Sequence, residues 1–161
     1  MATYFLDTSA LVKRHLTETG HNWVRALCDP LIGHTIVIAE VALVEVAATY
    51  SRMARETPRR LSPARRDRLI ADFETYVSRQ YVVVDVTRAL LTRALLTRAG
   101  ALCRVYPLRT YDAVQLASAL TRRDDDLAAG LAPLTFVCAD VTPLGVAASE
   151  GFAPQNPNAH P

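Results

Sequence analysis

The sequence predicts an α/β fold in which a parallel β-sheet is flanked by helices. Short runs rich in β-branched and aromatic residues, at 4–6, 34–38, 81–84 and 134–137, alternate with longer stretches of helical apolar periodicity. This alternation is typical of parallel strands joined by helical crossovers. The chain has 161 residues, of which 50% are hydrophobic, and this is enough for one domain with a substantial core.

The first predicted strand ends at an acid. The apolar run Tyr4–Leu6 stops at Asp7, and a helical pattern begins directly after it. Ligands of an open parallel sheet bind beyond the carboxyl ends of its strands, so Asp7 is placed to face a substrate. Asp is also a common N-cap, and capping of the next helix explains Asp7 equally well.

Two helical pieces follow Asp7. The first is expected to run to Leu16, with Lys13 and Arg14 on its solvent side. The second, at 21–28, is expected to direct Trp23 into the core.

The strand at 34–38 leads into a long helix, 40–55, that carries two acids. Glu40 and Glu45 are five positions apart, which places them about 140° from each other around the helix axis. Glu40 is explained by the favourable interaction of an acid with a helix N-terminus. Glu45 lies among apolar residues, where a carboxylate needs a partner or a metal ion, so Glu45 is the better functional candidate.

The segment 52–68 is strongly basic. It contains seven arginines against Glu56 and Asp67, and Ser62 is a good N-cap for a new helix that continues to Arg79. The pattern predicts a basic helical hairpin. Such a run can bind the phosphates of a nucleic acid, or it can simply be a solvated surface.

The second half of the chain places two more acids at comparable positions. Thr110 is expected to cap a helix whose first turn contains Asp112, and Asp140 follows the strand 134–137. The other expected elements are a strand at 81–84, a helix at 87–99 closed by Gly100, a solvated loop at Asp124–Asp126, and a helix at 141–149. Residues 1–152 are expected to form the domain, with a short edge strand near 152–154 and a frayed C-terminal tail at 153–161.

Composition excludes several classes of protein. No apolar run approaches the roughly 20 residues that span a bilayer, and a signal peptide pattern is absent, so the expected compartment is the cytoplasm. Cys28, Cys103 and Cys138 show neither a disulfide framework nor a zinc-binding spacing. The net charge of +2 is too small to indicate by itself a protein that binds nucleic acid.

The four acids Asp7, Glu45, Asp112 and Asp140 are therefore expected to converge at one edge of the sheet. Two carboxylates about 5 Å apart repel by roughly 3 kcal/mol at an effective dielectric constant near 20, so such a cluster needs protons or a cation. Carboxylate oxygens with retained waters are the ligands that Mg²⁺ or Mn²⁺ prefers.

The ordered set of motifs around these acids resembles the PIN-domain ribonucleases, specifically the VapC-type toxins of toxin–antitoxin pairs. The similar segments are FLDTSALVKR, VALVEVAA, RTYDAVQLASAL and FVCAD, followed by EGF and NP. The resemblance implies a three-layer fold with a central parallel sheet of about five strands. One departure is Cys138, where relatives usually have Ser or Thr beside the fourth acid.

The resemblance also implies a function. Asp7, Glu45, Asp112 and Asp140 match the family's catalytic, metal-binding acids, and Thr8 and Ser9 match the hydroxyl residues that support the first acid. The implied activity is Mg²⁺-dependent or Mn²⁺-dependent cleavage of RNA by a metal-activated water, by a homodimer that a cognate antitoxin inhibits. The candidate phosphate-binding residues are Arg14, Arg52, Arg55 and Arg109.

Two other functions are compatible with parts of the pattern. A phosphohydrolase with Asp7 as nucleophile usually has a second Asp two residues on, where this chain has Ser9. A PIN-like module that binds RNA or a protein partner without cutting is the non-enzymatic alternative.

Overall fold

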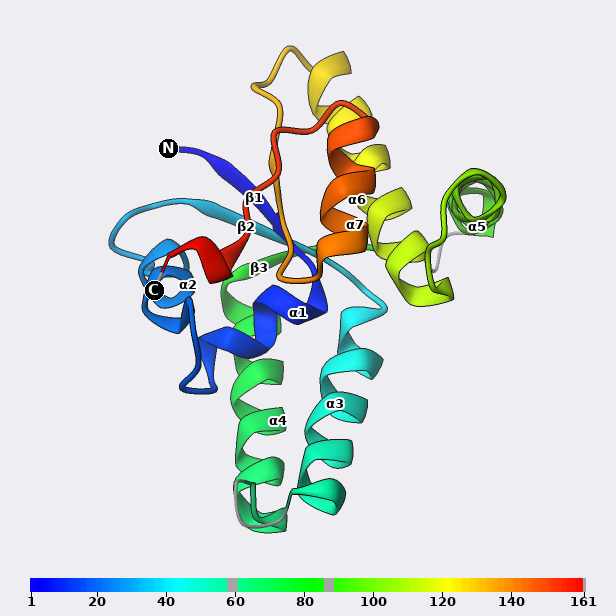
Figure 1. The fold of residues 1–161 in the computed structure, drawn as a ribbon. Coiled ribbons are helices and arrows are strands. Elements are labelled where there is room, and N and C mark those ends of the chain that lie inside the picture. The colour runs from blue at the N-terminus through cyan, green and yellow to red at the C-terminus, as the bar shows by residue number, and fades with distance from the viewer. Residues whose placement is uncertain (58–60, 86–88, 161) are drawn as a thin grey trace.

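The computed structural model describes residues 1–57, 61–85 and 89–160, and it has the predicted α/β architecture. One parallel sheet has the strand order β3-β2-β1-β4, formed by β1 (Thr3–Leu6), β2 (Thr35–Ala39), β3 (Tyr81–Val84) and β4 (Thr135–Val137). Phe5 of β1 lies beside Val37 of β2 on one side and beside Phe136 of β4 on the other. Helices cover both faces of the sheet, which confirms the three-layer fold (Figure 1).

The described sheet has four strands, not the five that the resemblance implied. The expected edge strand at 152–154 is replaced by a single bridge at Gln155, whose N–H donates to the carbonyl of Phe136 at 2.8 Å. Alternate residues donate in a parallel pair, so the next donor would be Pro157. Proline has no N–H, and the pairing therefore cannot extend into a strand.

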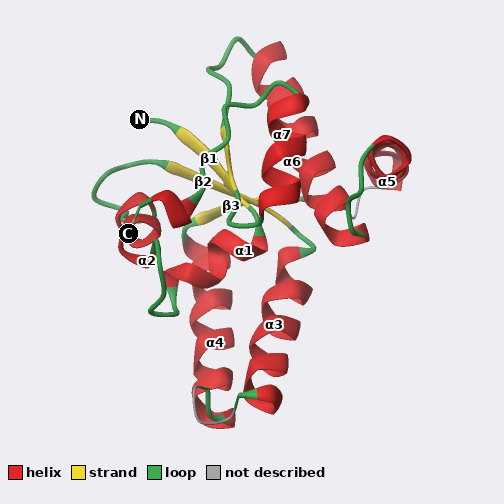
Figure 2. Cartoon of the chain, in the orientation of Figure 1, coloured by secondary structure: helices red, strands yellow, loops and turns green. Residues whose placement is uncertain are grey.

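The central strands β1 and β2 are mostly buried on both faces, whereas Val82 of the edge strand β3 is exposed, and alternate residues of the sheet enter two separate cores. Leu6, Ile36 and Ile38 pack in one core, and Phe5, Val37 and Phe136 pack in the other. The first core lies under α1 (Thr8–Leu11), the 3₁₀ turn η1 (Val12–Arg14), α2 (His21–Leu27), α3 (Ala42–Glu56) and α4 (Pro63–Arg79). The second core lies under α5 (Ala89–Val105), α6 (Thr110–Ala128) and α7 (Val141–Ser149). Figure 2 shows these three helices on the other side of the sheet from α3 and α4.

The basic segment forms the predicted helical hairpin. Helices α3 and α4 run side by side away from the sheet (Figure 1), and Ser62 caps α4 by accepting a hydrogen bond from the N–H of Arg65. Tyr50, Leu61 and Phe73 are buried between or beneath the two helices. Arg59 and Arg60 of the basic run lie outside the described residues.

Three helix ends differ from the prediction, at the end of α5 and at both ends of α6. Helix α5 continues past Gly100 to Val105, since good helix formers follow the glycine and no proline occurs before Pro107. Helix α6 includes Asp124–Asp126, which were expected in a solvated loop. Asp126 is buried and accepts a hydrogen bond from Arg122 at 2.7 Å, an i,i+4 pair that supports helix instead of loop. Arg109, not Thr110, occupies the N-cap position of α6.

Lys13 is buried, although the pattern placed it on the solvent side of its helix. The chain tightens from α1 into η1 at this point, which rotates Lys13 out of the expected register. Its ammonium group donates to Glu18 at 3.1 Å and to the carbonyl of Thr19 at 3.0 Å. The lysine therefore ties the loop after η1 to the helix.

The segment expected to be a frayed tail packs against the domain. Residues 157–159 form a 3₁₀ turn, η2 (Pro157–Ala159), and Pro157 is buried. The imidazole of His160 stacks on the indole of Trp23, with ring centroids 4.4 Å apart and an angle of 4° between the planes. Trp23 is thus partly buried against the core, as predicted, and also contacts the last residues of the chain.

None of the described helices is both long enough and apolar enough to cross a lipid bilayer.

Candidate active site

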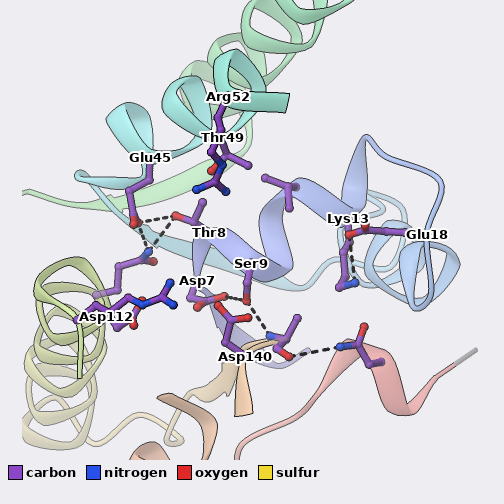
Figure 3. Close-up of a pocket in the computed structure, with 15 residues that line it drawn as sticks. Asp7, Thr8, Ser9, Lys13, Glu18, Glu45, Thr49, Arg52, Asp112 and Asp140 are labelled. Carbon is purple, nitrogen blue, oxygen red and sulfur yellow. Dashed lines mark hydrogen bonds and ion pairs between the residues drawn. The ribbon is translucent and has the colours of Figure 1, made fainter. Parts of the chain in front are cut away.

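The topology of the sheet brings the four predicted acids into one pocket. Asp7 follows β1 and Asp140 follows β4, its neighbour in the sheet, while Glu45 lies on α3 and Asp112 lies in the first turn of α6. All four line a pocket with a volume of about 390 Å³ (Figure 3). The four acids therefore lie together at the carboxyl edge of the sheet, as expected.

Asp7 is both a helix cap and a pocket residue. Its Oδ1 accepts hydrogen bonds from the N–H of Ala10 at 3.1 Å and from the hydroxyl of Ser9 at 2.7 Å, so it caps α1. Its Oδ2 accepts from the thiol of Cys138 at 3.0 Å. Asp7 therefore caps α1 and also faces the pocket, so both of the roles that the sequence suggested for it are present.

Burial makes the charged form of Asp7 costly. Its exposed fraction is only 4%, and desolvation raises the pKa of Asp7 from 3.8 to about 6. The hydrogen bonds from Cys138, Ser9 and Ala10 lower the pKa and offset part of this rise, whereas the negative charge of Asp140 raises it further. A cation in the pocket would remove this penalty.

Glu45 is held by two donors from other elements. Its Oε2 accepts a hydrogen bond from the Thr8 hydroxyl at 2.7 Å and another from the amide of Gln115. Burial raises the pKa of Glu45, and the charges of Asp112 and Asp140 add to the rise. Thr8 therefore supports the second acid, whereas the resemblance assigned it to the first.

Gln115, on α6, is a pocket residue that the sequence analysis did not predict. It is 2% exposed, and its amide also donates to the Thr8 hydroxyl at 2.8 Å, so it joins α6 to α1 and α3. The signal was present in the sequence, because Gln115 is the one polar residue in the otherwise apolar run from Ala113 to Ala117. It lies one helical turn after Asp112, on the side that faces the pocket.

Asp112 and Asp140 complete the acidic side of the pocket. Burial raises the pKa of Asp112, as does the charge of Asp140, while the nearby Arg109 lowers it. The carboxylate of Asp140 occupies the N-cap position of α7 but forms no capping hydrogen bond. Its orientation therefore depends on how its backbone is held.

The departure at Cys138 supports the first acid more directly than the fourth. Its thiol donates to Asp7, and its sulfur accepts a hydrogen bond from the N–H of Asp140 at 3.3 Å. Burial and the neighbouring charge of Asp7 both raise the pKa of Cys138, so this side chain remains a neutral donor. The thiol thus connects the first and the fourth acid.

The structure separates the four candidate arginines into two groups. Arg52 and Arg109 line the acidic pocket. Arg55 is exposed on α3 and is not among the residues that line the pocket. Arg14 points elsewhere: its guanidinium donates to the Tyr81 hydroxyl at 2.6 Å and to Gln80 at 2.9 Å, and it lies 3.6 Å from the centroid of the Tyr76 ring.

The donors in the pocket fit a small hard cation. Four carboxylates from four separate segments supply only oxygen, and the pKa values of Asp7, Glu45 and Asp112 are all raised. Among the described residues no three potential ligands yet converge on one point. Mg²⁺ keeps several of its waters and is usually bound through one or two carboxylates, so it does not require a preformed cage.

Comparison with known proteins identifies the family. The family model for the PIN domain matches residues 4–128. Two proteins of Mycobacterium tuberculosis, Ribonuclease VapC45 of strain CDC 1551 / Oshkosh and Ribonuclease VapC49 of strain ATCC 25618 / H37Rv, are each 34% identical over 131 residues, which cover 79% of this chain and 81% of theirs.

A solved structure shares the fold. The crystal structure of VapBC2 from Rickettsia felis bound to a DNA fragment from their promoter matches with a TM-score of 0.50 and 14% identity, over 86% of this chain and 89% of that chain. The family model and the two relatives agree with the observed fold. The chain therefore belongs to the PIN-domain family, in its VapC-type branch.

Proposed function

We propose that this protein is a Mg²⁺-dependent or Mn²⁺-dependent endoribonuclease that acts as the toxin of a toxin–antitoxin pair. The observation that carries the proposal is that four carboxylates, far apart in the sequence, line one pocket in which burial and mutual repulsion raise the pKa of three of them. The two relatives named as ribonucleases support the choice of RNA as substrate.

The chain's own residues have distinct parts in this reaction. Asp7, Glu45, Asp112 and Asp140 would hold the cation, which when bound supplies Lewis acidity that activates water and stabilises the leaving oxygen. Ser9 and Cys138 orient Asp7 and favour its ionised form by donating to its two oxygens. Thr8 and Gln115 orient Glu45 in the same way.

Arg52 and Arg109 are the proposed phosphate ligands. Both line the pocket with the acids, and a guanidinium matches two phosphate oxygens at once. Single-stranded or loop RNA is the proposed form of the substrate, because its backbone and bases are accessible to side chains.

Apolar side chains next to the pocket acids favour protein partners. Val44 precedes Glu45, Tyr111 precedes Asp112 and Val141 follows Asp140, and their exposed fractions are 62%, 48% and 79%. Exposed apolar side chains beside a functional site are typical of surfaces that another protein covers. This supports the proposed cognate antitoxin and homodimer, which the family resemblance implied.

The proposed activity is tested by cleavage of labelled single-stranded RNA. We expect cleavage with Mg²⁺ or Mn²⁺, loss of cleavage with excess EDTA, and recovery when the metal is restored. Cleavage that continues at the same rate in EDTA would contradict the proposed metal dependence. Binding of RNA with no cleavage under any metal would favour the non-catalytic module instead.

The two groups of arginines predict different phenotypes. Arg52→Ala is expected to raise KM for RNA about 10-fold, which corresponds to one charge-assisted hydrogen bond, with little change in stability. Arg14→Ala is expected to leave KM unchanged and to lower the free energy of unfolding by about 1–3 kcal/mol, because it removes two hydrogen bonds and a cation–π contact. Steady-state kinetics and urea denaturation of both variants check this, and an increase in KM for Arg14→Ala alone would reverse the assignment.

A further inference from the structure

The segment 155–160 reaches from the end of β4 to helix α2 and contributes a residue to the acidic pocket. Its start is fixed to β4, because Gln155 donates to the carbonyl of Phe136 at 2.8 Å and accepts from the N–H of Cys138 at 3.1 Å. Asn158 lines the pocket together with the four acids. Figure 1 shows this segment, in red, beside α2.

The far end of the segment is anchored by a close backbone approach. Gly20 has a φ of +84°, and a Cβ atom at this position would lie 2.2 Å from the carbonyl oxygen of Pro157. The stack of His160 on Trp23 lies next to this contact. Only glycine allows both the conformation and the approach, so Gly20 is what lets the segment lie against α2.

Asn158 acts on the peptide that precedes the fourth acid. Its side-chain amide donates to the carbonyl of Ala139 at 3.3 Å, and the N–H of Ala139 donates to the Ser9 hydroxyl at 2.8 Å. The same hydroxyl donates to Asp7 at 2.7 Å. Ala139, which precedes Asp140, is therefore held at its N–H by the Ser9 hydroxyl, which also supports Asp7, and at its carbonyl by Asn158 (Figure 3).

We propose that the segment 155–160 is a positioning element of the acidic pocket, in which Asn158 fixes the Ala139–Asp140 peptide and thereby the carboxylate of Asp140 relative to that of Asp7. The inference rests on the proposed function in that the pocket must bind a divalent cation. If docking of the segment favours the metal-binding arrangement, bound metal must favour docking by the same factor. Asn158 is thus a positioning residue and not a metal ligand.

Two glycine variants separate docking from backbone strain. Gly20→Ala should displace the segment and weaken Mn²⁺ binding about 10-fold, the scale of losing an outer contact of a metal site. Gly130→Ala is the matched control, because Gly130 has a similar φ of +72° but a Cβ there meets nothing within 4 Å. It should keep the Mn²⁺ affinity of the parent protein. Trp23 is the only tryptophan, so its fluorescence reports whether His160 is still stacked on it.

Substitution of Asn158 tests the specific contact without moving the glycine. Asn158→Ala should also weaken Mn²⁺ binding about 10-fold, and Asn158→Gln, which keeps an amide donor, should recover part of the loss. Both variants should fold like the parent, since Asn158 is exposed. Mn²⁺ affinity is measured by electron paramagnetic resonance, independently of RNA cleavage.

The outcomes distinguish this inference from the proposed function. If the parent protein binds Mn²⁺ and cuts RNA, but Asn158→Ala and a displaced Gly20→Ala both bind Mn²⁺ with the parent affinity, the positioning role is wrong and the nuclease assignment stands. If Asn158→Ala raises KM for RNA while Mn²⁺ affinity is unchanged, Asn158 contacts RNA and the inference is overturned. A parent protein that neither binds Mn²⁺ nor cuts RNA overturns both.

Discussion

Asp7→Asn is expected to abolish Mg²⁺-dependent RNA cleavage while the fold is retained. The substitution keeps the size of the side chain and the oxygen that caps α1, but it removes the negative charge at the centre of the acidic pocket. Loss of an outer contact of a metal site costs roughly 10–100-fold, so loss of a charged ligand should lower kcat/KM by more than about 100-fold. Asp112→Asn, which removes a pocket carboxylate from α6, should have an effect of similar size.

The matched control is Asp124→Asn, which also removes one carboxylate from α6. Asp124 pairs with Arg98 and Arg123 and does not line the pocket, so this variant should cut RNA at the parent rate. Cleavage by each preparation is compared at several Mg²⁺ concentrations, with circular dichroism to check folding. Undiminished cleavage by folded Asp7→Asn or Asp112→Asn would remove the basis for the catalytic assignment.

The parts of the fold that local sequence determines were predictable. The β-branched run before Ala39 and the apolar run before Asp7 each form a strand buried on both faces, where pattern and environment agree. The four pocket acids were also predictable from local sequence, because each interrupts an apolar pattern at the end of a strand or near the start of a helix. Ser62 was recognisable as a cap because capping depends only on its immediate neighbours.

The features that were missed depend on contacts between distant segments. The three prolines and the polar residues after Phe152 are typical of a frayed end, and nothing local indicates that Gly20 leaves room for Pro157. Arg14 and Arg52 are equally basic in the sequence, but only the tertiary structure places Arg14 against Tyr76 and Arg52 in the pocket. Which arginine is free to meet a phosphate is thus a property of the fold, not of the composition.

The raised pKa of Asp7 predicts that the metal-free protein loses stability as the pH rises from about 4 to about 6. The unfolded chain releases this proton near pH 3.8 and the folded chain releases it near 6, so within this window the folded state binds more protons. Stability falls with rising pH wherever the folded state binds more protons. A difference of about two pKa units corresponds to about 3 kcal/mol, which is lost in full above the folded pKa.

Asp7→Asn should therefore stabilise the metal-free protein while it inactivates the enzyme. Since asparagine carries no charge to desolvate, the variant should gain up to about 3 kcal/mol over the parent at pH 7.5 and much less at pH 4.5. Urea denaturation in EDTA at both pH values measures this, and the comparison between two proteins cancels the titration of Glu45 and Asp112. Added Mg²⁺ should stabilise the parent and not the variant, because only the parent retains the full set of carboxylates. An Asp7→Asn protein that is no more stable than the parent at pH 7.5, or that gains the same amount at both pH values, would contradict the predicted cost of burying the charge of Asp7.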